Sequence, residues 1–201
     1  MLTLKPGLRL YKTALDRAAQ EDLVASLREI LREAPLFQPV MPRTGKAFSV
    51  RMSNCGPLGW VSDLQGYRYQ QNHPETGRAW PPMPEGVIRL WRDFAECDAL
   101  PDACLINYYD AQARMGPHQD RDEVDFDAPI LSLSLGDSCR FRHGGETRGE
   151  KSETLRLDSG DILVFGGPAR KMFHGVDRIL PGTSTLLLPP GRINLTLRRA
   201  R

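Results

Sequence analysis

The sequence is poor in cysteine and shows no cysteine pairing pattern. Its 201 residues contain only Cys55, Cys97, Cys104 and Cys139, and no two of them have the CxxC spacing. Disulfide frameworks and zinc sites need cysteines at short, regular spacings, so neither is predicted. We interpret the four thiols as reduced and expect the protein to be cytoplasmic.

The sequence also lacks a large excess of charge and any long apolar run. Its formal net charge is +2, so contact with nucleic acid would have to rest on a local patch rather than on a global basic field. No apolar run approaches the roughly 20 residues of a membrane span, and no signal peptide opens the chain. We therefore expect no contact with a membrane.

Length and composition are those of an ordinary soluble globular protein. The chain is 40% hydrophobic and 26% charged, and it has no internal repeat or low-complexity tract. A chain of this length can bury one sizeable core, or at most two small ones. We interpret residues 1–201 as a single domain.

Helical periodicity is confined to the N-terminal half. Over residues 16–33, leucine and isoleucine recur at spacings of three and four, and Asp16 is placed to cap the N-terminus. A second such stretch covers residues 87–100, with Pro101 just beyond it. Both are predicted helices that pack an apolar side on a sheet, while residues 1–13 favour one or two short strands.

Residues 39–86 differ in composition from the rest of the chain. They include seven prolines and several glycines, so regular structure should be short, and long loops in a compact domain often bind ligands. Aromatic and basic side chains are interspersed there, a combination that can stack bases and neutralise phosphates. Composition alone, however, favours another interpretation, in which these aromatic side chains fill small hydrophobic clusters under the loops. The residues concerned are Trp60, Tyr67, Tyr69, Trp80, Arg43, Lys46, Arg51, Arg68 and Arg78.

Beyond residue 100 the periodicity changes to two, and turn residues separate the apolar runs. Many short strands after a helical N-terminal part predict an antiparallel barrel or jelly roll with the helices on one side, an α+β fold. The predicted strands cover residues 103–109, 113–118, 129–136, 139–143, 153–157, 161–165, 174–178, 185–188 and 192–199.

Two metal-binding side chains occur at alternate positions of an extended segment. His118 and Asp120 project from the same side, because strand side chains alternate between faces. His174, 56 positions downstream, would complete the two histidines and one carboxylate that hold non-haem Fe(II) while leaving positions open. The HxD pair alone would be weak evidence. His73 and His143 have no ligand-spaced partner, and we interpret them as surface or loop histidines.

The last predicted strand separates apolar from polar side chains. Ile193, Leu195 and Leu197 fall on one face, and four polar residues fall on the other. In an isolated strand the polar face would lie in water. Inside a barrel, its two guanidiniums would need an anionic partner, and a small dicarboxylate would suit them. The polar residues are Arg192, Asn194, Thr196 and Arg198, and Asn107 and Tyr109 share one face of the strand at 103–109.

Together these residues resemble the AlkB family of Fe(II)- and 2-oxoglutarate-dependent dioxygenases, and within it the bacterial proteins. Many oxygenases share the HxD pair, whereas the ending RINLTLR and the segment NCGPLGW are specific. The resemblance covers roughly residues 45–199. Its motifs are His118–Asp120, His174, Arg192–Arg198, Asn54–Trp60, Gln65–Tyr67, Trp80–Pro84, Asn107–Tyr109, Ala128–Ile130 and Gly144–Gly145.

The resemblance implies a double-stranded β-helix (jelly-roll) core at about 103–199, N-terminal helices packed on one sheet, and a nucleotide-recognition lid at about 39–86. It also implies three sets of functional residues. Fe(II) would be bound by His118, Asp120 and His174; 2-oxoglutarate by Asn107, Tyr109, Arg192, Asn194, Thr196 and Arg198, with Arg192 on the distal carboxylate; and the substrate by Met52, Trp60, Tyr67, Asp122 and Arg148.

The implied activity is oxidative demethylation of N-alkylated bases, such as 1-methyladenine and 3-methylcytosine, in single-stranded nucleic acid. O₂ and 2-oxoglutarate would be the co-substrates, and formaldehyde, succinate and CO₂ the products. Alkylated DNA would be bound by a monomer, with double-stranded DNA and RNA left open as substrates. Two alternatives remain: an oxygenase of the same fold acting on RNA, protein or a small molecule, and a non-catalytic barrel that binds a dicarboxylate or nucleic acid.

Two residues depart from the family pattern. Tyr108 stands where the family often has arginine, so a contact assigned to that position does not carry over. Phe165 replaces the tryptophan usually found before the distal histidine. Because phenylalanine is still aromatic, it should preserve the packing there.

Overall fold

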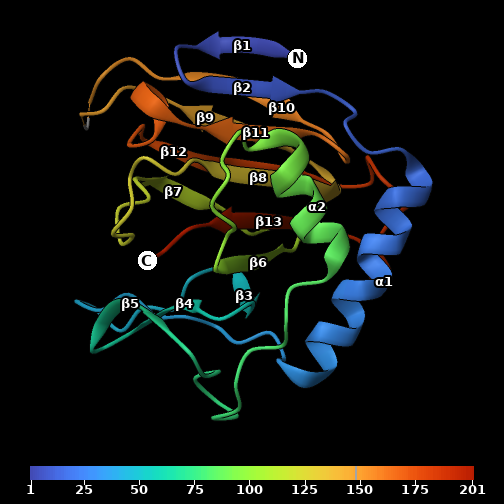
Figure 1. Ribbon diagram of the computed structural model, residues 1–201, viewed down its shortest axis with the longest axis vertical. Coiled ribbons are helices and arrows are strands. Elements are labelled where there is room, and N and C mark those ends of the chain that lie inside the picture. Colours follow the sequence, from blue (N-terminus) through green and yellow to red (C-terminus); the bar gives the residue numbers. More distant parts are fainter. Residues whose placement is uncertain (148) are drawn as a thin grey trace.

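In the computed structural model of the protein, which describes residues 1–147 and 149–201, two antiparallel sheets face each other (Figure 1). The larger sheet has the strand order β1-β2-β11-β8-β13-β6-β3, and the smaller has the order β10-β9-β12-β7. Apolar side chains from both sheets, such as Phe165 and Phe141, form one core between them. The strands of the larger sheet are β1 (Leu2–Lys5), β2 (Leu8–Tyr11), β11 (Ile162–Phe165), β8 (Ile130–Gly136), β13 (Arg192–Arg198), β6 (Ala103–Tyr109) and β3 (Arg51–Cys55). Those of the smaller sheet are β10 (Glu153–Leu157), β9 (Ser138–His143), β12 (His174–Leu180) and β7 (Met115–His118).

Two helices cover the outer face of the larger sheet. Helix α1 (Arg17–Glu33) begins where the Asp16 carboxylate accepts a hydrogen bond from the Ala19 amide at 2.9 Å, which confirms the predicted cap. Its buried side chains and those of α2 (Glu85–Phe94) join one hydrophobic cluster with β6, β8, β11 and β13. Each fully buried leucine or isoleucine there contributes roughly 1.5–3 kcal/mol. The predicted α+β jelly roll with helices on one sheet is thereby confirmed.

The second helix is shorter than its periodicity predicted. It ends at Phe94 instead of continuing to residue 100, because Glu96 has a φ of 56° and takes the chain out of the helical direction. The turn that follows still packs on the helix, since the indole of Trp91 donates a hydrogen bond to the carbonyl of Ala99 at 3.0 Å. Within residues 1–147 and 149–201, neither helix has the length and apolar character that crossing a bilayer requires.

One predicted strand, at residues 185–188, is wrong. The segment forms a series of bends in which Leu186 and Leu187 are both buried and Leu188 is 81% exposed. A strand would place successive side chains on opposite faces, so this apolar run instead covers the core as a loop. The remaining predicted strands are confirmed with boundaries that differ by at most two residues at either end.

Residues 39–86 hold little regular structure, as their composition predicted. β3 extends the larger sheet beside β6, while β4 (Gly59–Asp63) and β5 (Gly66–Gln70) form a separate hairpin below it in Figure 1. The Asn54 side chain bonds both the amide and the carbonyl of Trp60 and so closes the turn between β3 and β4. A side chain at Gly59 would lie 2.4 Å from the Trp80 indole, so only glycine fits this turn.

Candidate metal centre

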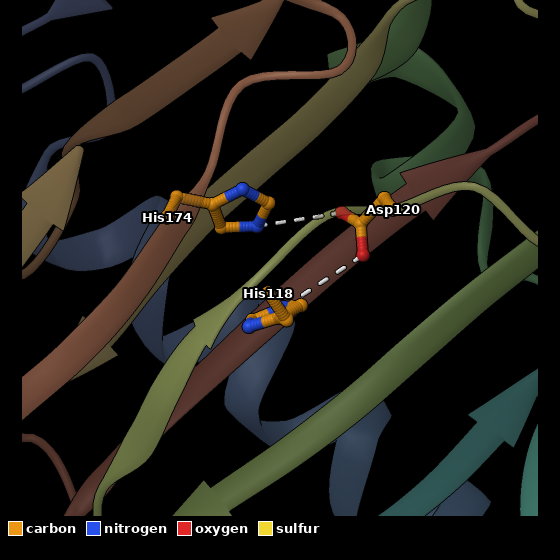
Figure 2. Close-up of side chains that lie close together, drawn as sticks. All are labelled: His118, Asp120 and His174. Atoms are coloured by element: carbon orange, nitrogen blue, oxygen red, sulfur yellow. Dashed lines mark ion pairs between the residues drawn. The ribbon is translucent and has the colours of Figure 1, made fainter. Parts of the chain in front are cut away.

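Two strands of the smaller sheet bring three potential metal ligands together. β7 ends at His118 and β12 begins at His174, which is its register partner, while Asp120 follows β7 by two residues. His118 Nε2 lies 3.8 Å from Asp120 Oδ1, and His174 Nε2 lies 3.5 Å from Asp120 Oδ2 (Figure 2). The ligand atoms of the three residues lie within 4.8 Å of one another, so a single ion between them could contact all three.

Both imidazoles are oriented by backbone carbonyls. The Nδ1 atom of His118 lies 3.0 Å from the Gly116 carbonyl oxygen, and Nδ1 of His174 lies 3.0 Å from that of Met172. Because a carbonyl only accepts hydrogen bonds, each Nδ1 must carry the proton, which leaves the Nε2 lone pair directed towards Asp120. This is the tautomer that binds a metal through Nε2.

Charge also suits metal binding. Burial and, after it, the neighbouring His174 lower the pKa of His118 to about 4, although 38% of the side chain is exposed at the mouth of the site. The ring is therefore neutral near pH 7. Burial alone would raise the pKa of Asp120, but Arg198 and both histidines hold it well below its usual range. Two neutral imidazoles and one carboxylate are the protonation states in which this set coordinates a metal.

A buried network of charges lies behind Asp120. The Glu123 side chain, 0% exposed, accepts a hydrogen bond from Arg198 Nη1 at 2.9 Å and lies 3.2 Å from Arg170 Nη2. The Tyr69 hydroxyl donates to the same carboxylate, and Arg198 Nη2 contacts Asp120 Oδ1 at 2.8 Å. The network therefore joins the β4–β5 hairpin to the metal-ligand segment. The sequence did not identify Glu123 or Arg170, because neither lies in a periodic element.

Replacing Glu123 with glutamine is expected to lower the free energy of unfolding by about 3–5 kcal/mol, because it leaves two buried guanidiniums short of negative charge. Urea unfolding followed by circular dichroism measures the loss. Asp125→Asn is the matched control, since its partly exposed pair with Arg199 at 3.4 Å should contribute at most about 1 kcal/mol. Equal stability of the two variants would contradict a structural role of the network.

The polar face of β13 is buried, as one of its two interpretations required. Arg192 is 1% exposed, lies over the ring of Tyr109 at 5.2 Å and donates one hydrogen bond, to Ser134 Oγ at 2.9 Å. Its Nε and Nη1 atoms are buried without a partner, and no carboxylate of the described residues pairs with it. The Asn107 amide oxygen is also buried and unpaired. Since a buried guanidinium is costly without an anion, this pocket fits a bound carboxylate.

The other polar residues of β13 are engaged within the protein. Asn194 donates to Ser132 Oγ at 2.8 Å and to the Leu133 carbonyl at 3.0 Å, and it accepts from Thr196 at 3.0 Å. Their side chains thus brace the strand rather than present free polar atoms. The serines of β8 were missed as contacts of β13, although their strict alternation with leucine signalled a polar face.

Three of the predicted substrate residues contact one another at the β4–β5 hairpin. The Trp60 ring stacks on Tyr67 with centroids 5.6 Å apart, and its indole nitrogen donates to Asp122 Oδ2 at 2.8 Å. Met52 is buried in the core cluster that Trp60 joins, and it is the register partner of Asn107. The structure brings these side chains together across the junction of hairpin and core. Arg148, also predicted, lies outside the described residues.

Two histidines predicted to be surface or loop residues are buried. His73 occupies a loop, as expected, but its ring is inside, where Nε2 lies 2.8 Å from the Pro35 carbonyl oxygen and Nδ1 accepts from two amides. His143 ends β9 as the register partner of His174 and is 3% exposed. Their lack of a ligand-spaced partner said nothing about burial, which depends on how the sheets and loops pack.

The structure shows the contacts of Tyr108 and Phe165, the two residues that depart from the family pattern. Tyr108 pairs in register with Ile193, so it lies on the face of the larger sheet opposite to Asn107 and Tyr109, and it donates to the Pro190 carbonyl at 3.2 Å. Phe165 is buried with its ring centroid 5.0 Å from that of His174. An aromatic side chain therefore still packs on this histidine.

Known proteins share the sequence and the fold. Residues 7–198 match the family described as the 2OG-Fe(II) oxygenase superfamily. The chain is 51% identical to the alpha-ketoglutarate-dependent dioxygenase AlkB homolog of Caulobacter vibrioides, over 100% of this chain and 90% of that protein. It is 40% identical to the alpha-ketoglutarate-dependent dioxygenase AlkB of Escherichia coli, over 90% of this chain and 85% of that protein.

Two further proteins extend the likeness. A DNA N(6)-methyladenine demethylase of Arabidopsis thaliana, ALKBH1C, is 34% identical over 98% of this chain and 49% of its own length. The solved structure of OsALKBH1 superimposes with a TM-score of 0.79 at 31% identity, covering 98% of this chain and 100% of that one. The chain therefore belongs to the AlkB family of 2-oxoglutarate- and Fe(II)-dependent dioxygenases.

Proposed function

We propose that the protein removes alkyl groups from the nitrogen atoms of damaged DNA bases by oxidation. The observation that carries this proposal is the cluster of His118, Asp120 and His174, with the buried and incompletely paired Arg192 on the strand that also supplies Arg198. The donor set suits Fe(II), and the unpaired guanidinium suits a carboxylate of 2-oxoglutarate. A non-catalytic barrel would not need both.

Each residue then has a defined task. His118, Asp120 and His174 would hold Fe(II), and Arg192 would bind the distal carboxylate of 2-oxoglutarate. The remaining co-substrate residues, Asn107, Tyr109, Asn194, Thr196 and Arg198, would line the same cavity, with Asn194 and Thr196 bracing its wall. When bound, Fe(II) would activate O₂, the oxidant; one oxygen atom would oxidise 2-oxoglutarate to succinate and CO₂, and the other would hydroxylate the alkyl group, which then leaves as formaldehyde.

The protein's own contribution would be to orient and isolate the reacting groups. The carbonyls of Gly116 and Met172 hold the ligand imidazoles in the required tautomer. Arg198 keeps Asp120 ionised and correctly placed, while the Glu123 carboxylate keeps Arg198 in position. No side chain needs to act as a nucleophile.

We propose that residues 39–86 form the lid that receives the damaged base, above a core at about 103–199 of one domain. Tyr67 stacks on the Trp60 indole, and a base taken out of its stack would bind against the other face of this ring. Asp122, which holds the indole nitrogen, adds a negative charge that favours cationic bases. Met52 and Arg148 would complete the base-binding wall.

The proposed partner is single-stranded alkylated DNA, with double-stranded DNA and RNA as further substrates to be tested. The DNA demethylase activity in the name of the Arabidopsis relative supports a nucleic-acid substrate. We further propose that the protein acts as a monomer in the cytoplasm, where its free cysteines would stay reduced. Light scattering of the purified protein tests the monomer.

A single assay tests the proposed function. Purified protein is incubated with single-stranded DNA containing 3-methylcytosine, Fe(II), 2-oxoglutarate and ascorbate, and loss of the methyl group is measured with formaldehyde and succinate. Equal amounts of demethylated base, formaldehyde and succinate are expected. Succinate formation without demethylation of DNA or RNA oligonucleotides would instead indicate an oxygenase acting on protein or a small molecule.

The lid should read both the ring and the charge of the base. Trp60→Ala is expected to weaken binding of methylated oligonucleotides by about 1–3 kcal/mol, the value of one stacked base, while slow uncoupled turnover of 2-oxoglutarate continues. Binding is measured by fluorescence anisotropy and turnover by succinate release. A Trp60→Ala variant that binds and repairs like wild type would contradict base recognition by the lid.

Two substitutions at Asp122 separate its charge from its hydrogen bond to Trp60. Asp122→Asn keeps an acceptor for the indole but loses the charge, so repair of cationic 3-methylcytosine should fall more than repair of neutral 3-methylthymine. Asp122→Ala loses both and should impair both lesions. Asp127→Asn, an exposed carboxylate of the same loop, is the control. Equal effects of Asp122→Asn on both lesions would argue against charge recognition.

A further inference from the structure

A row of arginines crosses the outer face of the smaller sheet. Arg140 of β9 is the register partner of Arg156 on β10 and of Arg178 on β12. Register partners on neighbouring antiparallel strands project to the same side, with Cβ atoms about 4.5–5.5 Å apart. All three side chains are exposed. We call Arg140, Arg156 and Arg178 the arginine row.

A β-bulge in β12 creates one end of this row. The pairing of β12 with β9 shifts between Val176, which is buried in the core, and Arg178. Asp177 is the extra residue, so Arg178 faces outward beside it instead of inward as simple alternation would require. Ile179 then returns to the core. The sequence pattern alone would have placed Arg178 inside.

Carboxylates neutralise part of this face. Asp177 accepts two hydrogen bonds from Arg142, at 2.9 and 2.8 Å, and lies 3.6 Å from Arg140. Asp158 accepts from Arg156 at 2.6 Å. These pairs are exposed or half-buried, where an ion pair contributes at most about 1 kcal/mol. They therefore do not account for the concentration of guanidiniums.

Two arginines of this face have no counter-charge. In the part of the chain that the structure describes, no ion pair involves Arg178 or its neighbour Arg114, which immediately precedes β7. The face thus combines five arginines with two carboxylates, and one of these carboxylates, Asp158, also pairs with Lys12 at 2.9 Å, so positive charge is in excess. Like charges directly opposite each other on adjacent strands are destabilising. Both helices pack on the larger sheet, so neither of them compensates for this charge.

An open groove connects the arginine row to the lid. It has a volume of about 500 Å³ and is lined by Ser49, Arg114, Asp177 and Arg178, among others. The Ser49 hydroxyl donates a hydrogen bond to the Arg114 carbonyl at 2.8 Å and accepts one from the Arg114 amide at 3.1 Å. The preceding residue, Phe48, packs edge-on against Trp60 with ring centroids 6.4 Å apart.

We propose that the arginine row binds the phosphate backbone of the nucleic-acid strand whose damaged base enters the metal centre. The proposal rests on the proposed function, because it assigns the flanking part of the same substrate. Guanidinium groups bind phosphate through paired hydrogen bonds, and a row of guanidinium groups suits the regularly spaced phosphates of a nucleic-acid strand. Charge complementarity and the groove that reaches the lid favour this occupant over an acidic protein.

The geometry sets a minimum substrate length. Arg178 lies four residues along β12 from His174, or about 13 Å at the usual rise of a strand. A strand must therefore extend past the nucleotides that directly flank the damaged base to reach Arg178. A trinucleotide with the damaged base in the middle therefore cannot use the row, whereas a 25-mer can.

The test is a double variant, Arg140→Gln with Arg178→Gln, assayed on a 25-mer and on a trinucleotide that both carry 3-methylcytosine. At 0.1 M salt the KM for the 25-mer is expected to rise about ten-fold, and the slope of log affinity against log salt should fall in magnitude by about 1.4, or about 0.7 for each phosphate that is no longer neutralised. The kcat, and repair of the trinucleotide, should stay at wild-type values. Arg28→Gln with Arg89→Gln removes the same charge from the helices and is the control.

Three results would overturn the proposal: an unchanged salt slope, an equal loss in the control variant, or an equal loss on the trinucleotide, which would place the effect at the metal centre. Binding of an unmethylated 25-mer separates this proposal from the proposed function. If wild type repairs no oligonucleotide but binds the 25-mer with a slope that depends on Arg140 and Arg178, only the demethylase assignment fails. If wild type does not bind it, the arginine row is not a nucleic-acid surface.

Discussion

Alanine at His118, Asp120 or His174 is expected to reduce oxidative turnover below detection while the fold is retained. Each residue supplies one of the three candidate ligand atoms that lie within 4.8 Å of one another among the residues that the structure describes. Removing one leaves two ligands, too few to hold Fe(II) in a defined geometry. The sheets do not depend on these side chains, because the core between them is formed by apolar residues.

Anaerobic Fe(II) titration, succinate release and circular dichroism together check this expectation. The variants should show a wild-type spectrum, weak iron binding and no succinate. Gln119→Ala is a matched control from the same segment: its amide donates to the carbonyls of Glu146 and Lys171 rather than facing the ligands. Wild-type turnover by any of the three alanine variants would remove that residue from the metal site.

Arg192→Ala is expected to raise the apparent KM for 2-oxoglutarate steeply. Losing one partner of a buried charge pair costs about 2–5 kcal/mol, which corresponds to roughly 30-fold to several thousand-fold in affinity. Binding of Fe(II) should be little changed, because Arg192 contacts Ser134 and Tyr109 but none of the three proposed ligands. The effect should therefore appear as a change in KM for the co-substrate, measured with saturating iron.

The same variant should lose affinity for 2-oxoglutarate without losing stability. Without 2-oxoglutarate, Arg192 is a buried charge with two unpaired nitrogens, so its removal should not lower the free energy of unfolding as a core truncation would. The rise in Tm that 2-oxoglutarate gives wild type should disappear. Arg199→Ala, at the partly exposed end of the same chain segment, is the control. An unchanged KM and an unchanged Tm shift would return this residue to a purely structural role.

Local rules were enough for much of the fold. Leucine and isoleucine at spacings of three and four located α1, and the side chain of Asp16 marked its start. Strict alternation located β6, β8 and β13 and assigned Arg192 and Asn194 to one face. These features depend on residues near one another in the chain, where helix and strand geometry fixes which side chains share a side.

The same rules failed where contacts with residues far away in the chain determine the structure of a segment. Leu186 and Leu187 have the composition of a strand but cover the core as a loop. A bulge at Asp177 turned Arg178 outward against the alternation. His73 is held inside by the Pro35 carbonyl, 38 positions away in the chain. In each case packing of the complete domain outweighed a local preference.

For the functional site, the sequence by itself determined the identity of the ligands. Alternation paired His118 with Asp120 and defined the polar face of β13, and His174 completed the donor set of two histidines and one carboxylate. Only the tertiary structure decided that β7 and β12 are neighbours, that this polar face is buried instead of solvated, and that Glu123, Arg170 and Tyr69 form a charged network behind Asp120. The reason is physical: burial and ion pairing depend on which strands pack together, and spacing along the chain does not encode contacts between residues that are 47 to 129 positions apart.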